Sequence, residues 1–342
     1  MRTININIAV DVMGGDNAPE EIIKGALKAV SESKDANLLL VGKSDIICKQ
    51  LKTADFSEEK VEIIDAPEVI NMKDSPSKSL RKKKKSSINI GTRLIKENRA
   101  GAFISAGNTG AVMAAGLLNI GRLSGIKRPA IGTFIPSHKG KTLVMDAGAN
   151  VDSKPLNLLQ SSLMGQLYAR LILNKNNPKI GLLSIGEEEE KGNKLTTETY
   201  KLINNDVRIT NFIGNVEGRD VFNGSCDVII CDGFTGNIVL KTTEGAASFV
   251  LDNLKEAFTS NFLTRIGAFL LKSRLKNIKQ NLDYRQYGGA PLLGLQGPVI
   301  ISHGSSDAVA IYNAVLLAKK IVKNNVIKEI EKIIHKEGEK NE

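Results

Sequence analysis

Three glycine-containing stretches of the chain combine polar residues in a way that suits the binding of an anion. In VIICDGFTGNIVLKTTEG, residues 228–245, an apolar run stops at Asp232, passes through two glycines and restarts with helical spacing. SAGNTGAVMAAGLL, residues 105–118, and SHGSSDAVAIYNAV, residues 302–315, repeat this arrangement. Glycine lets the backbone approach a ligand closely, and the first N–H groups of a helix can donate to a phosphate. We therefore predict anion binding at these loops.

The same residue types have a structural alternative. Thr235, Asn237 and Ser305 belong to the types that cap the first turn of a helix without binding any ligand. For one loop alone capping is the better interpretation, whereas three such loops together favour anion binding. None of them matches the GxxxxGK[ST] pattern of ATP-binding loops, and no GxGxxG follows the first predicted strand. The sequence therefore favours neither ATP nor NAD, and we expect no cofactor.

The wider sequence predicts the elements that position these loops. Short apolar runs, many of them β-branched, end in polar glycine-rich loops that lead into helical patterns. This rhythm predicts an α/β, Rossmann-like three-layer fold with a mostly parallel sheet, in one domain over residues 1–342. Ligands bind such sheets outside the carboxyl ends of the strands, so we expect six loops to converge on one edge. Their polar residues are Asp11, Asp16, Ser105, Asn108, Asp146, Asn150, Lys191, Asn193, Asp232, Asn237, His303 and Asp307.

Composition limits the compartment and the partners. The chain has 47 Lys and Arg residues against 37 Asp and Glu residues, a formal net charge of +10 that favours an anionic partner. Aromatic residues make up only 4% and Trp is absent, which argues against nucleic acid stacked on aromatic side chains. Three cysteines without a CxxC pattern indicate a reducing compartment and no zinc site. With no signal peptide and no apolar stretch of about 20 residues, we expect a cytoplasmic protein.

Residues 258–280 predict an amphipathic helical extension. Apolar residues recur at helical spacing, and the intervening charged residues are all basic. Packing on the core is the ordinary explanation of such a helix. Because its charges are all of one sign, we favour insertion into an anionic membrane surface, in a homodimer that presents two such helices. The predicted membrane-facing residues are Phe258, Phe262, Ile266, Phe269 and Leu270.

Four further features have competing interpretations. The basic run at residues 81–85 is either a solvated loop or an arm that attracts an acidic partner or closes over phosphate. Cys231 fits a small buried residue better than a nucleophile, because no histidine is evident as its base. His303 is equally consistent with a structural hydrogen bond and with a base or phosphate ligand. We interpret the acidic run at residues 187–190 as a solvated loop, and expect no metal.

The order of several motifs resembles the bacterial phosphate acyltransferases that use acyl carrier protein, also called acyl-phosphate synthases. The stretches that carry the resemblance run from the first predicted strand to about residue 320, and they include AVDVMGGDNAP, ISAGNTGAVMAAGLL, MDAGANVDSKP, IGLLSIGEEEEKGNKLT, VIICDGFTGNIVLKTTEG and YGGAPLLGLQGPVIISHGSSDAVAIYNAV. The resemblance implies a fold related to phosphotransacetylases and isocitrate-dehydrogenase-like enzymes. It also implies a homodimer that needs no redox cofactor.

The activity implied by the resemblance is reversible transfer of a long-chain acyl group from acyl carrier protein to inorganic phosphate. The product, an acyl phosphate, would supply a membrane glycerol-3-phosphate acyltransferase at the start of phospholipid synthesis. The acidic carrier suits the net charge, phosphate suits the glycine loops, and the lipid product suits peripheral association with the inner face of the cell membrane. We expect no binding of nucleic acid.

Phosphate can attack a thioester directly, so the protein has only to hold both reactants and stabilise the oxyanion. We expect Lys191 to neutralise phosphate or the oxyanion beside Asn237, with Asp232 orienting one of them and His303 as a further catalytic candidate. The predicted phosphate- and substrate-binding residues are Asp11, Ser105, Gly107, Asn108, Thr109, Asn150, Asn193, Thr235 and Gly236. Two alternatives stay open, namely a phosphotransacetylase-like enzyme acting on coenzyme A thioesters and a non-catalytic protein that binds membrane or nucleic acid through its basic surface.

Overall fold

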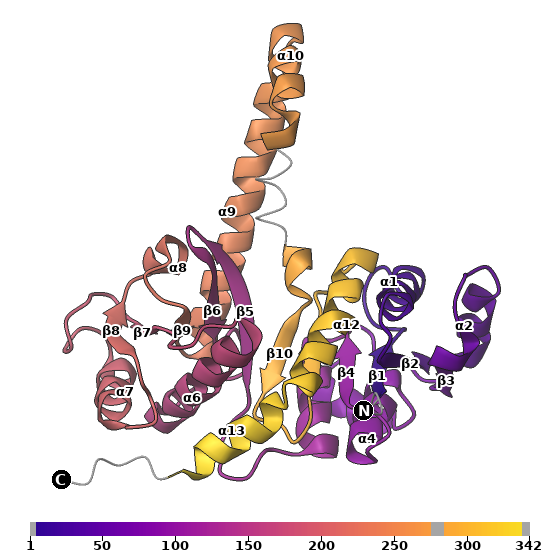
Figure 1. Ribbon diagram of the computed structural model, residues 1–342, viewed down its shortest axis with the longest axis horizontal. Coiled ribbons are helices and arrows are strands. Elements are labelled where there is room, and N and C mark those ends of the chain that lie inside the picture. Colours follow the sequence, from indigo (N-terminus) through magenta and orange to yellow (C-terminus); the bar gives the residue numbers. More distant parts are fainter. Residues whose placement is uncertain (1–4, 275–283, 337–342) are drawn as a thin grey trace.

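The computed structural model describes residues 5–274 and 284–336, and within them one continuous sheet of eleven strands forms the middle of the molecule (Figure 1). The sheet is mostly parallel, with helices on both faces, which confirms the predicted α/β class. In spatial order its strands are β3 (Val61–Asp65), β2 (Ala36–Gly42), β1 (Ile6–Asp11), β4 (Ala102–Ser105), β11 (Val299–Ile301), β10 (Ala290–Leu293), β5 (Ala130–Ser137), β6 (Gly140–Met145), β9 (Val228–Ile230), β7 (Ile180–Leu183) and β8 (Phe212–Val216).

One face of the sheet carries the largest hydrophobic core. Apolar residues recur along its helices at helical spacing, as Ile22, Ile23, Ala26 and Leu27 do in the first of them, and this pattern turns one side of each helix toward the strands. Six helices contribute buried residues to this core, namely α1 (Glu20–Ser31), α2 (Ser44–Leu51), α6 (Pro155–Ile172), α7 (Lys194–Asn205), α12 (Ala308–Lys323) and α13 (Val326–His335).

The other face has two smaller cores. One contains residues of α3 (Pro76–Lys82), α4 (Ser87–Lys96), α5 (Thr109–Ala115) and the π-helical turn η2 (Gly116–Ile120). The other contains Val221 of α8 (Asp220–Asn223) and is covered by Val239 of α9 (Gly233–Thr259). Two short 3₁₀ turns, η1 (Glu58–Lys60) and η3 (Tyr284–Tyr287), lie in the connections between these elements.

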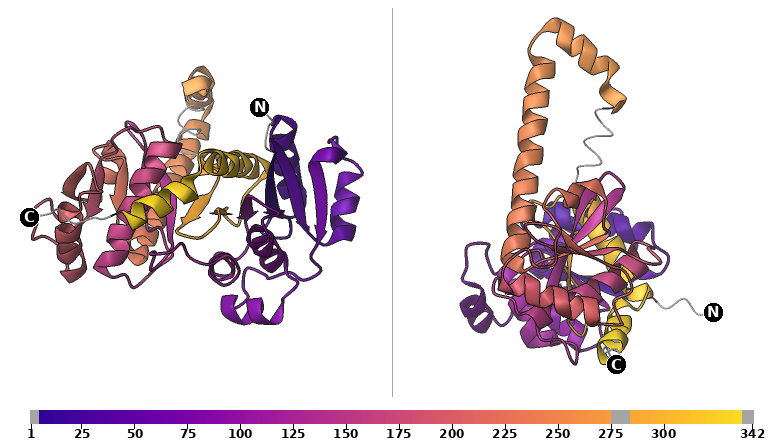
Figure 2. Two further views of the ribbon diagram at one scale, coloured as in Figure 1. Left: turned by 60° about the horizontal axis from the view of Figure 1, so that its bottom comes forward. Right: turned by 90° about the vertical axis from the view of Figure 1, so that its left-hand side faces the viewer.

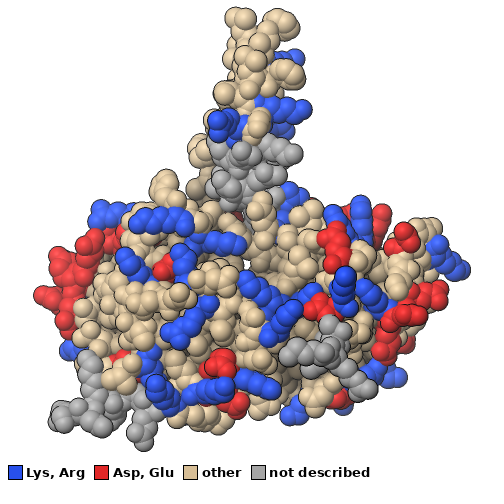
Figure 3. Space-filling view, in the orientation of Figure 1, with Lys and Arg blue, Asp and Glu red and all other residues tan. Residues whose placement is uncertain are grey.

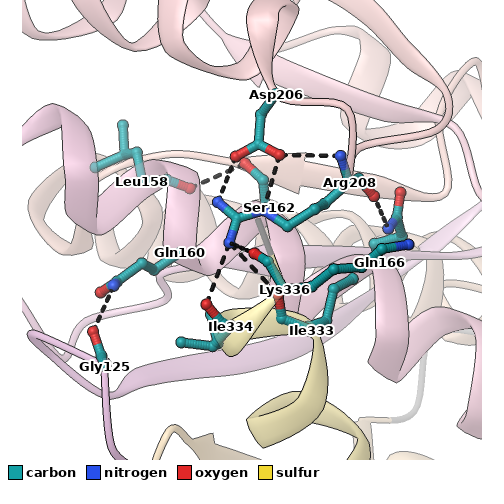
Figure 4. A network of polar contacts seen from close by, with 10 residues as sticks. All are labelled: Gly125, Leu158, Gln160, Ser162, Gln166, Asp206, Arg208, Ile333, Ile334 and Lys336. Atoms are coloured by element: carbon teal, nitrogen blue, oxygen red, sulfur yellow. Dashed lines mark hydrogen bonds and ion pairs between the residues drawn. The ribbon is translucent and has the colours of Figure 1, made fainter. Parts of the chain in front are cut away.

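A brace of polar contacts joins α6, α7 and the end of α13 (Figure 4). Arg208 lies 2.5 Å from Asp206 in an ion pair and donates hydrogen bonds to the carbonyl groups of Ile334 and Lys336. Gln166 of α6 in turn donates to the carbonyl of Arg208 at 2.8 Å. Because Asp206 and Arg208 are both mostly shielded from solvent, the brace fixes the last helix against the second half of the sheet.

A helical projection stands away from this body. Most of α9 and all of α10 (Phe262–Leu270) lie outside the three layers (Figure 2). No residue of α10 is buried, and its side chains include Phe262, 77% exposed, and Phe269, 74% exposed. The predicted single helix over residues 258–280 is therefore wrong in its bounds: Phe258 belongs to α9, and Asn261 caps a separate α10 by accepting a hydrogen bond from Thr264 N at 2.9 Å. Residues 275–280 lie outside the described part of the chain.

No helix among the described residues is long and apolar enough to cross a membrane.

Candidate active site

The polar loops lie on two opposite sides of the sheet, because the carboxyl ends of its strands point in two opposite directions. These two sides, each formed by strand ends, are called the first and the second edge. Strands β1, β4 and β11 run in one direction, whereas β6, β9 and β7 run in the other. The reversal comes from three successive antiparallel pairings, β11 with β10, β10 with β5, and β5 with β6. The expectation that all six loops share one edge is therefore wrong. Asp11, Ser105 and His303 follow strands at the first edge, and Asp146, Lys191 and Asp232 follow strands at the second.

At the first edge, Asp11 is enclosed by its own loop and by its neighbours. Its Oδ2 accepts a hydrogen bond from the Ser105 hydroxyl at 2.7 Å, and Ser105 Oγ accepts one from Gly107 N at 3.1 Å. A Cβ on Gly14 would lie 2.6 Å from Asp11 Oδ2, so only glycine allows this approach. Burial raises the pKa of Asp11, and hydrogen bonds from Ser87 and Ser105 oppose that rise. The buried carboxyl group holds two turns together.

The start of α5 is likewise covered by its own chain. Asn108 Oδ1 accepts a hydrogen bond from Ala111 N at 3.0 Å, while Asn108 Nδ2 donates to the carbonyls of Met72 and Asp74. A Cβ on Gly110 would lie 2.7 Å from Cγ of Pro76, the first residue of α3. Asn108 is therefore the N-cap of α5, whereas the Thr109 hydroxyl is exposed and makes no hydrogen bond to described residues.

The basic run and His303 also lie on this side of the fold. Lys83 donates to Asp74 and to the carbonyl of Val69, each at 2.7 Å, so it anchors the run to the chain, while the remaining cations of the run are exposed. His303 Nδ1 lies 2.7 Å from Ser305 Oγ and accepts from Ser305 N at 3.2 Å, which are bonds within its own turn.

At the second edge, Asp146 organises the loop that follows β6. One carboxylate oxygen accepts hydrogen bonds from the N–H groups of Ile131, Gly148 and Ala149, at 3.1, 3.1 and 2.8 Å. The other accepts from Asn150 N at 2.8 Å and from Asn150 Nδ2 at 2.7 Å. Burial raises the pKa of Asp146, and these hydrogen bonds oppose that rise. The sequence predicts Asp146 only as one of twelve polar loop residues. Its position directly after an apolar strand, at the start of DAGAN, is the feature of the sequence that indicates a structural role.

The start of α9 interlocks with this loop. Asp232 caps the helix, since its Oδ1 accepts from Thr235 N at 2.9 Å and its Oδ2 from the Thr235 hydroxyl at 2.7 Å. Gly233 N donates to the carbonyl of Asn150 at 2.8 Å, and a Cβ on Gly233 would lie 2.7 Å from that oxygen. Gly236 packs directly on the carbonyl of Asp146. The bond between Gly233 N and the Asn150 carbonyl thus fixes one loop to the next, while Asp232 and Thr235 bond to each other within the first turn of α9.

Lys191 and Asn237 differ from these neighbours. Both are exposed, and neither the Lys191 ammonium nor the Asn237 amide has a hydrogen bond or ion pair to described residues. The Ser184 hydroxyl donates to the Lys191 carbonyl at 2.9 Å, which ties the loop after β7 to its strand. Asn237 lies beside the loop after β6, because a Cβ on Gly148 would be 3.6 Å from Asn237 Oδ1. This edge therefore presents a cation and an amide with unused capacity to bind an oxyanion.

The loops that carry Lys191 and Asn237 also contain a helix cap and two exposed apolar residues. Asn193 caps α7 by accepting from Thr196 N at 3.0 Å. Ile185 is 80% exposed in the loop that holds Lys191, and Phe234 is 58% exposed at the start of α9. Loops that carry both unused polar groups and exposed apolar side chains suit a ligand that has an anionic and an apolar part.

Cys231 has no features of a nucleophile. It is buried at the end of β9, its Sγ lies 3.7 Å from the carbonyl of Asp146, and burial raises the pKa of its thiol. Among residues 5–274 and 284–336, no group of three or more His, Cys, Asp or Glu side chains is arranged to hold a metal ion.

The fold is similar to that of two phosphotransacetylases. A phosphotransacetylase from Streptococcus pyogenes superposes with a TM-score of 0.62 at 18% identity, over 95% of this chain and 94% of that one. The EutD phosphotransacetylase from Staphylococcus aureus gives a TM-score of 0.59 at 14% identity, over 93% and 94%. At these identities the likeness is one of fold.

Sequence similarity gives the family. Residues 6–329 match the family model described as "Fatty acid synthesis protein". A "Phosphate acyltransferase" from Halothermothrix orenii is 57% identical over 98% of this chain and all of its own length, and one from Desulfitobacterium hafniense is 50% identical over 96% and 97%. The chain belongs to the phosphate acyltransferase family, which confirms the resemblance and the prediction of an enzyme.

Proposed function

We propose that the protein transfers a long-chain acyl group from acyl carrier protein to inorganic phosphate. In this proposal the reaction takes place at the carboxyl ends of β6, β9 and β7. The observation that carries this proposal is the pair Lys191 and Asn237, whose polar groups no described residue uses. The family of the chain supports phosphate as the acceptor, and the exposed Ile185 and Phe234 support an apolar acyl group beside it.

In the proposed reaction a phosphate oxygen attacks the thioester carbonyl carbon. The C–O bond forms, the C–S bond breaks through a tetrahedral oxyanion, and the thiolate leaves with the carrier. Lys191 neutralises phosphate or the oxyanion, and Asn237 donates to it. Asp146, Asp232, Thr235 and Asn150 act indirectly, since their hydrogen bonds hold the loops that carry the site. The residues of the first edge are not part of this proposed centre.

The proposed product, an acyl phosphate with a long apolar tail, has to reach a membrane enzyme that acylates glycerol 3-phosphate. The exposed apolar residues of α10 support peripheral binding to an anionic membrane, because nothing in the described chain covers Phe262 or Phe269. We further propose a homodimer that presents two such helices to the inner face of the cell membrane.

A coenzyme A thioester is the alternative donor, since the fold is shared with phosphotransacetylases. The test compares phosphate-dependent turnover of one long acyl chain attached either to acyl carrier protein or to coenzyme A. A kcat/KM at least about tenfold higher with the carrier supports the proposal. Equal values, or a preference for coenzyme A, would instead establish the alternative.

A further inference from the structure

A shallow groove lies near the start of β6, at the opposite end of that strand from the candidate active site. Its volume is about 200 Å³, and it lies between the β5–β6 hairpin, the end of α6, η3 and α12. Its lining combines aromatic, aliphatic and polar side chains with two lysines, namely Phe134, Lys141, Ile172, Leu173, Gln286, Tyr287, Asn313, Leu316, Leu317 and Lys320.

The alternation of β6 explains why a lysine lies here. Leu143 and Met145 both belong to the large core, and Lys141 occupies the next position on the same face of the strand. Its ammonium lies 5.4 Å from the ring centroid of Phe134 and 4.8 Å from that of Tyr287. The alternation of Leu143 and Met145 would predict an apolar residue at position 141, but this position is occupied by a lysine.

The ammonium of Lys141 has no anionic partner in the part of the chain that the structure describes. Two less exposed cations do have one, since Lys83 pairs with Asp74 at 2.7 Å, and Arg285 with Asp307 at 2.6 Å. Lys141 is itself exposed at the start of β6, and the partial loss of hydration at its ammonium, together with the positive charge of Lys320, lowers its pKa. The two aromatic rings offset only part of the cost of bringing two cations together.

Lys320 supplies the second cation. Its ammonium donates to the carbonyl of Ile172 at the end of α6 at 2.6 Å, which fixes it at the groove and leaves further N–H groups for a ligand. Figure 3 shows Lys and Arg side chains gathered in the middle of this face of the molecule, below the helical projection. An oxyanion held by both ammonium groups would remove their repulsion and gain charge-assisted hydrogen bonds.

We propose that this groove is a binding site for a small organic anion whose carboxylate or phosphate head lies between Lys141 and Lys320 and whose short apolar body packs on Leu316 and Leu317. The site is separate from the reaction centre, because Lys141 is near the start of β6 whereas Asp146 follows its end. Fatty carboxylates and alkyl phosphates share the required chemistry.

The test measures the binding of octanoate, octyl phosphate and uncharged octanol to the full chain by titration calorimetry. We expect octanoate, octyl phosphate or both to bind the unchanged protein, and octanol to bind at least about tenfold more weakly. The stronger of the two anions identifies the head group. Lys141→Gln should weaken that binding by about tenfold or more, and Lys141→Arg should restore most of it.

Lys139→Gln is the matched control, since Lys139 is exposed in the same hairpin, as Lys141 is, but does not line the groove. Because the Lys141 ammonium is exposed and, among the described residues, contacts only the two aromatic rings, Lys141→Gln should change the Tm little. The proposal is wrong if Lys141→Gln binds octanoate and octyl phosphate as the unchanged protein does, or if octanol binds equally well. Binding of alkyl chains to the exposed residues of α10 would produce such a result.

Discussion

At the scale of single residues, the proposed chemistry depends on Lys191. Replacing it with Ala removes the only charge that the proposal places on the phosphate or oxyanion, and we expect kcat to fall by about 10²- to 10³-fold. Lys194→Ala is the control, because Lys194 is also exposed and its ammonium lies 3.8 Å from Glu198 in a weak pair. Phosphate-dependent thiol release measures both variants. A Lys191→Ala enzyme with unchanged kcat would exclude the assigned role.

Asn237 makes a second, independent prediction. Its amide donates to the developing oxyanion in the proposed reaction, so Asn237→Ala should lower kcat by about 10²-fold with a smaller change in KM. Thermal unfolding should be little changed, because no described residue bonds to this side chain. A loss of Tm with no loss of kcat would show that Asn237 is structural.

Asp146 should matter for stability as well as activity. Asp146→Ala leaves several N–H groups buried without an acceptor, and we expect a loss of about 3 kcal/mol in the free energy of unfolding. Asp146→Asn should rescue little of it, because an amide NH₂ would face N–H donors. Asp152→Ala, at an exposed site, is the control in urea unfolding. Equal stability of the two Ala variants would contradict this account.

Sequence reasoning located the polar residues at the strand ends but could not separate caps from ligand groups. Asn108, Asn193 and Asp232 are of the types that do both, and each spends at least part of its side chain on the helix that follows it. Which groups remain available depends on neighbours far away in the chain, such as the carbonyls of Met72 and Asp74 that occupy the Asn108 amide.

At the scale of elements, α10 should bind membranes. Phe262→Glu combined with Phe269→Glu places two charges on its exposed apolar surface, and we expect loss of most co-flotation with vesicles that contain anionic phosphatidylglycerol. Phe222→Glu is the control, since Phe222 is 41% exposed on α8 of the body. Undiminished flotation of the double variant would argue that another surface binds the membrane.

The junction of β2 with α12 should make stability depend on acid. A hydrogen bond from Lys319, helped by the charges of Lys319 and Lys323, holds the pKa of Asp35 below its ordinary value of 3.8. A carboxyl group with a lower pKa in the folded state stabilises the fold above its unfolded pKa, and this contribution disappears as the pH falls through the folded pKa. Between about pH 4 and pH 2 the unfolding free energy should therefore fall more steeply for the unchanged protein than for Asp35→Asn. Parallel curves would contradict this assignment.

The order of elements was predictable, and their directions were not. Apolar runs that alternate with helical patterns indicate parallel strands, as most of the sheet confirms. The reversal depends on β10, a four-residue strand near the end of the chain that pairs with β5, about 160 residues earlier. Pairing between strands so far apart in the chain leaves no pattern in the sequence around either strand, so the reversal could not be predicted. Likewise, the break at Asn261 depends on a capping box, which apolar periodicity does not show.

At the scale of the whole molecule, the brace around Arg208 joins the last helix to the body (Figure 4). Arg208→Ala leaves Asp206 buried without its partner, and we expect a loss of about 3 kcal/mol in the free energy of unfolding. Arg99→Ala, which breaks the exposed pair with Glu62, should cost less than about 1 kcal/mol. Urea unfolding that ranks the two variants equally would contradict this role of the brace.

The proposed function assigns the body to acyl transfer from a water-soluble carrier and the projection to release of the lipid product. The most direct measurement is thiol release from a long-chain acyl carrier protein thioester, with and without inorganic phosphate, and with any acyl phosphate trapped as its hydroxamate. We expect release that requires phosphate, with one hydroxamate formed for each thiol. Release that is independent of phosphate, or no release from folded protein, would contradict the proposed function.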